Sequence, residues 1–339
     1  MRLFSMVIFC SAWLSSSSSR QPTSVDFIKV ELSGVAQGTS WHITYFGKDT
    51  VVIKSQVDSV LAVIDSSLSI YKPYSRIVAF NKSETGITID DHLRRVIKKS
   101  LETYRQTNGL FDITILPIVE AWGFGAKRID SLPDSAAIRS LLTCVGSRYL
   151  KLDGNRLTKL KPCVKIDVNG IAQGYSVDVI AGFLEKKGIK NYIVELGGEI
   201  RVLGKKHPVN ERFKIGIEGP AENDFEANPI EKILVVDRGA VTTSGNYRKY
   251  YESKGKKISH LMDPRTGHSI ENEMISVTVY AKDAITADAY DNALMAMGLT
   301  KAMKFLEKRH DIAGYLIYRL PNGNTADTAS SRFYHLLQH

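Results

Sequence analysis

The sequence predicts an α+β protein built in layers, with largely antiparallel or mixed sheets and packed helices. Three observations support this class: short segments in which apolar and polar residues alternate, apolar repeats of helical period between them, and no strict alternation of strand and helix. The chain has 339 residues, of which 43% are hydrophobic and 24% are charged. This composition excludes a disordered or fibrous chain, and a chain of this length needs no disulfide framework.

The N-terminal residues 1–20 predict an export signal, since a basic start, mostly apolar residues 3–14 and serines 15–19 follow one another. The apolar run is too short for a permanent membrane span. Cys10 stands where a lipoprotein signal places its acylated cysteine, but bulky Phe9 precedes it where a small residue is usual. The sequence therefore leaves lipidation of Cys10 open.

Residues 21–339 are expected to form a single domain, because no repeat, low-complexity linker or second membrane-length apolar run interrupts them. Strands are expected at 27–32, 41–46, 149–152, 156–160, 164–168, 192–195, 199–203, 213–218, 233–236, 258–262, 274–280 and 313–318. Helices are expected at 52–68, 93–104, 171–188, 284–297 and 301–308.

The formal net charge is +9, but the basic residues stand in short scattered groups. A nucleic-acid-binding protein more often gathers them into a stripe with interleaved aromatic residues, so we expect no nucleic-acid partner. The surplus indicates mild attraction for an anionic ligand or an anionic membrane surface. Cys144 and Cys163 could pair in an oxidising compartment, but spacing alone proves no bridge, and two buried thiols are the preferred interpretation.

The sequence contains no P-loop, dinucleotide-binding fingerprint, nucleophile elbow or zinc-ligand pattern. It contains instead several glycine-punctuated polar segments, of which Asn169-Gly170 stands directly before a predicted helix. Such a turn could hold a phosphorylated cofactor or present a carbonyl to a metal. An ordinary connection between a strand and a helix uses the same residues, so this segment alone decides nothing.

The predicted helix at 284–297 carries Asp288, Asp291 and Asn292 at positions i, i+3 and i+4, which share one helix face. Carboxylate and amide oxygens suit Mg²⁺, which binds few protein ligands and completes its shell with water and substrate phosphates. The alternative is an acidic helix turn that faces solvent. An exposed carboxylate contributes little to stability, so Asp288→Ala is expected to abolish turnover and leave the fold intact.

Together these segments resemble the ApbE family of FAD:protein FMN transferases, in the family's order from about residue 30 to residue 317. The segments that carry the resemblance are Gln37-Gly38-Thr39, Tyr71 with Asn81, Gly109-Leu110-Phe111-Asp112, Trp122-Gly123-Phe124-Gly125, Asp167 to Gly174, Glu195-Leu196-Gly197-Gly198, His260 with Asp263-Pro264 and Gly267, and Thr286-Ala287-Asp288 through Gly298. The resemblance implies an ApbE-like form of the α+β fold. It also implies that FAD is the substrate, that Mg²⁺ is the cofactor, and that the FMN half is joined through a phosphoester to a Thr or Ser hydroxyl of an acceptor protein, with release of AMP.

The resemblance also assigns roles to residues. It places Gln37, Tyr71, Leu110, Phe111, Asp112, Asp167 and Gln173 along the flavin nucleotide. It places the Gly170 carbonyl, Asp288, Asp291 and Asn292 at the metal, and His260 beside the scissile phosphates as the base. Two positions depart from the family: Asn292 stands where Thr is common and keeps an oxygen ligand, whereas Gln173 stands where Lys is common and lacks its charge.

Among the aromatic residues, Tyr71 is the choice for stacking on the flavin ring, because an amphipathic ring can stack and still hydrogen-bond. Trp122 and Phe124 are expected to be core or loop-anchoring residues. His260, as the side chain that titrates nearest neutral pH, suits proton removal from the acceptor hydroxyl, with a purely structural histidine as the alternative.

Two other functions stay open at this point. Water could replace the acceptor hydroxyl, which would give a Mg²⁺-dependent FAD pyrophosphatase yielding FMN and AMP, or the chain could be a non-catalytic flavin-binding export protein. The resemblance implies that the acceptor is a redox protein of a membrane complex that offers a Ser/Thr-Gly-Ala-Ser/Thr-like segment. The expected location is the periplasmic side of the inner membrane, with lipid anchoring through Cys10 left open.

Overall fold

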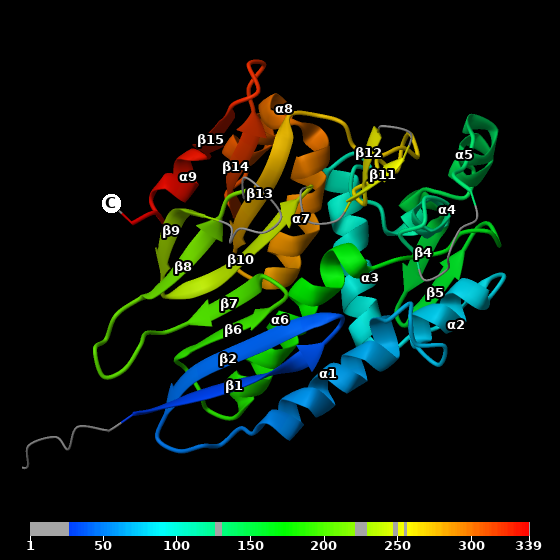
Figure 1. Cartoon of the computed structure of the whole chain (residues 1–339). Helices are drawn as coiled ribbons and strands as arrows, with labels where there is room; N and C mark the ends of the chain where they lie inside the picture. The colour runs from blue at the N-terminus through cyan, green and yellow to red at the C-terminus, as the bar shows by residue number, and fades with distance from the viewer. Residues whose placement is uncertain (1–26, 126–130, 221–228, 247–249, 254–255, 339) are drawn as a thin grey trace, which may run out of the picture.

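The computed structural model describes residues 27–125, 131–220, 229–246, 250–253 and 256–338 (Figure 1). The predicted export signal at 1–20, with Cys10, lies outside the described residues. No helix in the described ranges is long and apolar enough to cross a membrane.

The main sheet has eight strands, and each neighbouring pair in it is antiparallel. In spatial order the strands are β1 (Ile28–Ala36), β2 (Thr39–Gly47), β6 (Tyr192–Leu196), β7 (Glu199–Leu203), β10 (Arg238–Gly245), β13 (Met274–Ala281), β14 (Ile312–Arg319) and β15 (Thr325–Ala329). The predicted α+β class with a largely antiparallel sheet is confirmed. β10 and β15 were not predicted, because their polar threonines and alanines hide the apolar alternation.

Helices cover one face of this sheet (Figure 1). They are α1 (Lys54–Leu68), α3 (Asp91–Gln106), α6 (Asn169–Lys186), α7 (Ala284–Met297) and α8 (Leu299–Glu307). α6 lies on β6 and β7, α7 lies on β10 and β13, and α3 packs on the outer side of both helices. Alternate strand residues such as Ile43 and Val194 join α6 residues such as Ile180 in the core between sheet and helices.

The opposite face of the sheet is covered by the hairpin of β8 (Phe213–Glu218) and β9 (Ile230–Val236) and by α9 (Ser331–Tyr334). Phe213 and Phe333 pack there against Phe46 and Tyr315 of the sheet. Both faces are therefore buried, which fixes the register of the strands because a slip of one residue would exchange the two sets of side chains.

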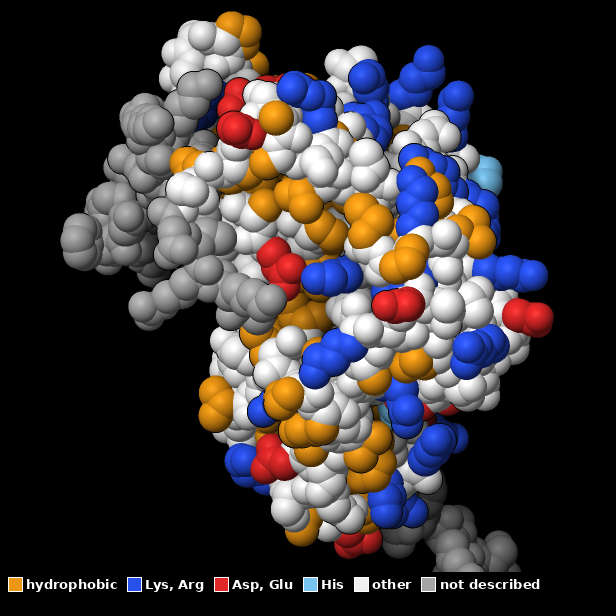
Figure 2. Space-filling model, turned by 90° about the vertical axis from the view of Figure 1, so that its right-hand side faces the viewer, with side chains coloured by type: hydrophobic (Ala, Val, Ile, Leu, Met, Phe, Trp, Pro, Cys, Tyr) orange, Lys and Arg blue, Asp and Glu red, His pale blue; other side chains and the backbone are white. Residues whose placement is uncertain are grey.

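The remaining elements stand to one side of the main sheet (Figure 1). They are α2 (Arg76–Lys82), α4 (Leu116–Ala121), α5 (Ser135–Leu142), the 3₁₀ helices Ile113–Ile115 and Ser147–Tyr149, the sheet of β3 (Gly86–Thr88), β5 (Arg156–Lys159) and β4 (Leu150–Asp153), and the hairpin of β11 (Tyr250–Ser253) and β12 (Lys256–Ser259). The predicted strand at 258–262 thus ends at Ser259. On the face shown in Figure 2, Lys and Arg side chains form several groups separated by apolar and uncharged surface.

Cys144 and Cys163 form a disulfide with a Cα–Cα distance of 5.6 Å, so the prediction of two thiols was wrong. The loops that carry them lie side by side, and Lys161 Nζ donates to the Thr143 carbonyl at 2.7 Å. This proximity arises from contacts between segments distant in sequence, which the spacing of the two cysteines does not report.

The predicted strand at 164–168 is also wrong, although the segment is buried. No strand pairs with it among the described residues; instead the Asn81 amide accepts from Ile166 N at 2.8 Å and donates to Ile166 O at 2.9 Å. Asp167 N donates to Ile113 O at 2.7 Å. An asparagine side chain thus satisfies the backbone groups that a strand neighbour would otherwise satisfy, and it holds this segment directly before α6.

Candidate active site

Carboxylates fix the start of α7. The Asp283 side chain caps the helix by accepting from Thr286 N at 3.1 Å. The Asp178 carboxylate of α6 accepts from Ala284 N at 2.9 Å and from Ile285 N at 2.8 Å. The first turn of α7 is therefore tied to α6, and the following turn is held between α6 and the sheet.

That following turn carries Asp288 and Asp291, which are only 4% and 1% exposed. Asp288 Oδ2 accepts from Gly174 N at 2.8 Å, and Asp291 Oδ2 accepts from Thr242 Oγ1 at 2.7 Å. The acidic turn therefore faces the protein, and the solvent-facing alternative is wrong. The premise of an exposed Asp288 is wrong for the same reason, and Asp288→Ala would leave a buried Gly174 N–H unpaired.

Gly174 allows α6 and α7 to approach closely here. A Cβ atom at this position would lie 2.5 Å from the Ala284 carbonyl oxygen and 2.6 Å from Asp288 Cβ. The glycine thus places its own backbone N–H within reach of the Asp288 carboxylate.

Asn292, one turn after Asp288, joins the cluster to α6 and β10. Its Oδ1 accepts from Ser244 Oγ at 3.0 Å, and its Nδ2 lies 3.5 Å from the Gly170 carbonyl oxygen. Gly170 has φ −81° and ψ 19°, outside α-helical values. The structure thus brings together all four predicted metal-site groups: the Gly170 carbonyl, Asp288, Asp291 and Asn292.

A third carboxylate, that of Glu199 on β7, belongs to the same region. Burial raises the pKa of Asp288 to about 7. Burial, with a smaller contribution from the Asp288 charge, raises the pKa of Asp291 well above its ordinary value. Burial and then the charges of Asp288 and Asp291 do the same for the pKa of Glu199. Each carboxylate makes ionisation of the others harder.

Two oxygens of this cluster are unsatisfied. Asp291 Oδ1 and Glu199 Oε2 are buried without a hydrogen-bond partner in the described part of the chain. Such atoms are costly unless a further group pairs with them, and a divalent cation is a fitting group. Among the described residues, no group of three or more His, Cys, Asp or Glu side chains is placed to hold a metal ion directly. The residues therefore fit Mg²⁺ bound by few carboxylates and by neutral oxygens, with water and substrate as further ligands.

The predicted flavin residues Gln37 and Gln173 lie near the N-terminal half of α6. Gln37 has φ 51° in the β1–β2 turn, and its Nε2 donates to Ser176 Oγ at 2.9 Å and to Asp65 Oδ1 at 3.2 Å. Gln173 Nε2 lies 2.9 Å from where a Cβ of Gly197 would stand. Gln37 therefore contacts α6, and Gln173 is part of it, in the half of the helix that also carries Gly170.

Asp167 and Tyr71 lie at the start of α6. Asp167 Oδ1 accepts from Asn169 N at 2.8 Å, and burial raises the pKa of Asp167 to about 6. Tyr71 is 58% exposed, and its hydroxyl hydrogen-bonds the Asn169 side chain. Its ring is thus available to a flat ligand.

The predicted segment Leu110, Phe111 and Asp112 also reaches this region. Phe111 is buried and lies close to Gly170. Asp112 accepts four hydrogen bonds, from N and Oγ1 of Thr114 and from N and Oγ of Ser147, at 2.6 to 3.0 Å. Its carboxylate therefore fixes the local turns, and a flavin contact of Asp112 stays a prediction.

His260 follows β12, and its ring lies edge-on to Phe124 with centroids 6.4 Å apart. The next residue, Leu261, belongs to the hydrophobic cluster that contains Ala287 and Leu294 of α7, so the loop after β12 is packed toward this helix. Trp122 Nε1 donates to Gly267 O at 2.7 Å, so the same loop is anchored a second time. The expected packing role of Trp122 and Phe124 is confirmed.

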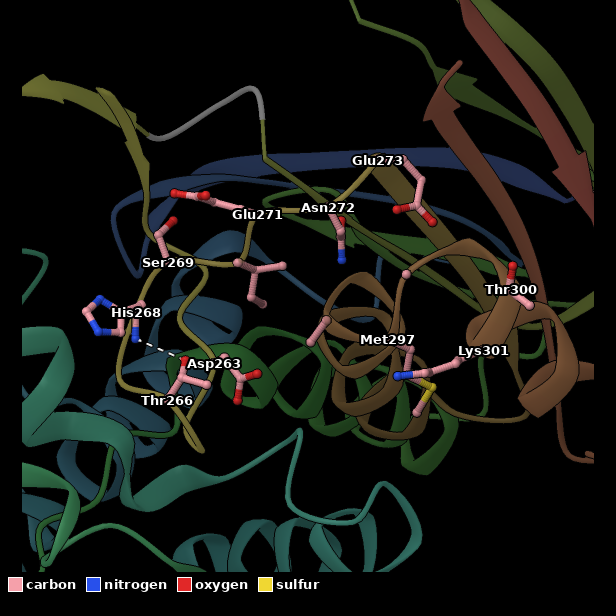
Figure 3. Close-up of a pocket in the computed structure, with 13 residues that line it drawn as sticks. Asp263, Thr266, His268, Ser269, Glu271, Asn272, Glu273, Met297, Thr300 and Lys301 are labelled. Carbon is pink, nitrogen blue, oxygen red and sulfur yellow. Dashed lines mark hydrogen bonds between the residues drawn. The ribbon is translucent and has the colours of Figure 1, made fainter. Parts of the chain in front are cut away.

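A cavity of about 610 Å³ opens beside this loop (Figure 3). Its walls include Asp263, Glu271 and Glu273 from the segment after His260, and Met297 and Lys301 around the end of α7. It adjoins a second hollow of about 940 Å³ that shares Asn272 and Glu273 with it. None of the predicted site residues lines either hollow, so the carboxylate cluster lies deeper, earlier along α7.

Three residues of the cluster were not predicted: Glu199, Thr242 and Ser244. Glu199 follows the glycine-rich segment Glu195-Leu196-Gly197-Gly198 and begins the predicted strand at 199–203, and a carboxylate at the start of an otherwise apolar strand was the available signal. Thr242 and Ser244 lie on the unpredicted strand β10, where the β-branched run Val241-Thr242-Thr243 was the available signal.

Comparison with known proteins agrees with this geometry. Residues 37–316 match the profile of the ApbE family. The chain belongs to the ApbE family. It is 32% identical to the FAD:protein FMN transferase of Haemophilus influenzae, over 97% of each chain. This member of the ApbE family also resembles two solved structures. It is similar to the flavin transferase ApbE of Vibrio cholerae, with a TM-score of 0.82, 31% identity, and coverage of 92% of this chain and 100% of that one. It is equally similar to the apo flavinyl transferase ApbE of Pseudomonas stutzeri, with a TM-score of 0.82, 30% identity, and coverage of 91% and 97%.

Proposed function

We propose that this chain transfers FMN from FAD to a Ser or Thr hydroxyl of an acceptor protein with the help of Mg²⁺, forming a phosphoester and releasing AMP. The observation that carries the proposal is the cluster of buried Asp288 and Asp291 with half-buried Asn292, in which Asp291 Oδ1 and the neighbouring Glu199 Oε2 are unsatisfied by the residues that the structure describes. Relatives that cover nearly the whole chain carry the name FAD:protein FMN transferase. A protein that only binds flavin has no need of this buried anionic cluster.

The residues divide into three groups by role. Asp288, Asp291, Asn292 and the Gly170 carbonyl would hold Mg²⁺, which when bound neutralises charge on the pyrophosphate. Gln37, Tyr71, Leu110, Phe111, Asp112, Asp167 and Gln173 would bind and orient the FMN half. His260 takes the proton of the acceptor hydroxyl.

The acceptor oxygen forms a bond to the phosphorus of the FMN half as its proton passes to His260. The bond from that phosphorus to the bridging oxygen breaks, and AMP leaves with the electron pair. In-line placement and charge neutralisation supply most of the rate, so no covalent enzyme intermediate is required.

We further propose that the chain is exported and works on the periplasmic side of the inner membrane, with Cys10 as a lipid attachment site. The Cys144–Cys163 disulfide supports export, because such bonds persist mainly in oxidising compartments. The proposed acceptor is a membrane redox protein with a Ser/Thr-Gly-Ala-Ser/Thr-like segment. If Cys10→Ala stays as firmly bound to membranes as the parent protein, Cys10 is not the anchor.

The test of the transferase proposal uses the purified chain with FAD, Mg²⁺ and an acceptor domain that carries such a segment. We expect AMP release, equimolar FMN attached to the acceptor, and loss of both in EDTA. Asp288→Asn should fail in this assay, and Asp153→Asn, at an exposed carboxylate on β4, should behave as the parent. Free FMN and AMP without a labelled acceptor would instead show an FAD pyrophosphatase.

A further inference from the structure

Glu199 is the first residue of β7 and is only 8% exposed. Its strand pairs with β10 so that Arg201 stands opposite Ala240 and Ile200 opposite Val241. The same register brings Glu199 beside Thr242, whose hydroxyl donates to Asp291 Oδ2. The side chain thus stands at the sheet surface on which the acidic turn of α7 rests.

The Glu199 carboxylate has an unsatisfied oxygen in this position. Oε2 is buried and has no hydrogen-bond partner within the described ranges. The next residue on the same face of β7, Arg201, is bound to Asp178 at 2.7 Å. The carboxylates of Asp288, Asp291 and Glu199 are thus all buried. The nearby Arg201 guanidinium pairs with Asp178 and not with any of these three.

The hairpin before β7 is built to place this residue. Gly197 and Gly198 have φ of 66° and 108°, in the region that favours glycine, and Gly198 N donates to Glu195 Oε1 at 2.7 Å. A Cβ at Gly197 would lie 2.9 Å from both Gln173 Nε2 and Thr39 Cγ2. The turn thus packs against the predicted flavin residue Gln173 of α6 and is followed directly by Glu199.

We propose that Glu199 is a further anionic residue of the cation site, facing the bound divalent ion from β7 while Asp288 and Asp291 face it from α7. Its free oxygen Oε2 would be available to pair with the ion's hydration shell. The proposal rests on the cation of the proposed function and adds a charge from the sheet side. A bound cation near Glu199 would explain why this carboxylate is buried although its Oε2 has no hydrogen-bond partner among the described residues.

The experiment measures Mn²⁺ binding by calorimetry on the EDTA-treated and dialysed mature chain, without FAD. Glu199→Gln should weaken Mn²⁺ binding by roughly 10- to 100-fold, the usual effect of removing a residue that supports a metal from beyond its direct ligands. The control is Asp153→Asn, which removes an exposed carboxylate on β4, outside the hairpin and the cluster. This control should bind Mn²⁺ within about threefold of the parent protein.

A second readout separates a cation role from a structural one. In EDTA, Glu199→Gln should melt at or above the temperature of the parent, because the substitution removes a buried charge that no partner compensates. A lower melting temperature with unchanged Mn²⁺ affinity would overturn the proposal, since Glu199 would then be structural. Unchanged affinity at any melting temperature would overturn it as well.

The test remains decisive if Glu199→Gln does not fold or if the parent protein does not bind Mn²⁺. If Glu199→Gln does not fold, Glu199→Asp decides: it keeps the charge on a shorter side chain, so weaker Mn²⁺ binding supports the proposal and unchanged binding overturns it. If the parent protein itself shows no saturable Mn²⁺ binding, the cation of the proposed function fails, and the role of Glu199 fails with it. Failure of Glu199 alone leaves the parent's Mn²⁺ affinity and flavin transfer intact.

Discussion

Asp288→Asn should make the protein more stable at pH 8 in EDTA while removing its response to Mg²⁺. The amide has the shape of the carboxylate, and its oxygen can still accept from Gly174 N, which now bonds Asp288 at 2.8 Å. The substitution therefore removes the buried charge and preserves the packing between α6 and α7.

The sign and size of the change in unfolding free energy follow from the pKa of Asp288, which burial raises from 3.8 to about 7. The fold disfavours the ionised form, so without metal this group costs stability as pH rises from about 4 to about 7, and the full cost persists above that range. The difference corresponds to about 4 kcal/mol at pH 8 and to about 1 kcal/mol at pH 4.5. In a protein of this size 4 kcal/mol corresponds to roughly 5–10 °C in melting temperature.

The assay is thermal unfolding of the parent, Asp288→Asn and the surface control Asp153→Asn, at pH 4.5 and pH 8, in EDTA and in excess Mg²⁺. The parent should gain about 3 kcal/mol from Mg²⁺ at a hundred times its dissociation constant, and Asp288→Asn should gain almost nothing. If Asp288→Asn is no more stable than the parent at pH 8 in EDTA, or responds to Mg²⁺ as the parent does, the reasoning about this carboxylate is refuted.

Three further predictions concern the base, the disulfide and the nucleotide. His260→Asn should keep FAD affinity within a few fold and lose transfer by roughly 10² to 10⁴; normal transfer, or loss of FAD binding by fluorescence titration, would show a different role. Replacing Cys144 and Cys163 by Ser should lower the free energy of unfolding in urea by about 3 kcal/mol for a loop of this length, and equal stability with and without reductant in the parent would contradict this. Gln173→Lys should bind FAD more tightly at low salt, because a cation is added beside a pyrophosphate, and unchanged affinity would place Gln173 away from the phosphates.

The metal face of α7 could be predicted from sequence because its geometry is local. Residues at i, i+3 and i+4 share a helix face wherever that helix lies, so Asp288, Asp291 and Asn292 could be grouped in advance. Their burial could not, since it depends on how closely α6 approaches at Gly174. The same limit hid Glu199, whose place at the cluster depends on the pairing of β7 with β10.

The two wrong predictions, a strand at 164–168 and two free thiols, also concern contacts between segments distant in sequence. The segment at 164–168 has the apolar pattern of a strand, but the Asn81 side chain meets its backbone groups from 85 residues away in sequence. Cys144 and Cys163 come together because two separate loops pack side by side. The roles assigned to His260, Tyr71 and Gln37 came from the resemblance to the ApbE family, since no local pattern identifies a residue that acts alone on its element.

The most direct measurement of the central claim is the mass of an acceptor domain after incubation with this chain, FAD and Mg²⁺, with AMP quantified in the same sample. We expect one FMN attached per acceptor at the Ser or Thr of the recognised segment, one AMP released for each, and neither in EDTA. An acceptor of unchanged mass with AMP and free FMN in solution would contradict transfer. Absence of AMP altogether, from a folded protein that binds FAD and Mg²⁺, would contradict catalysis.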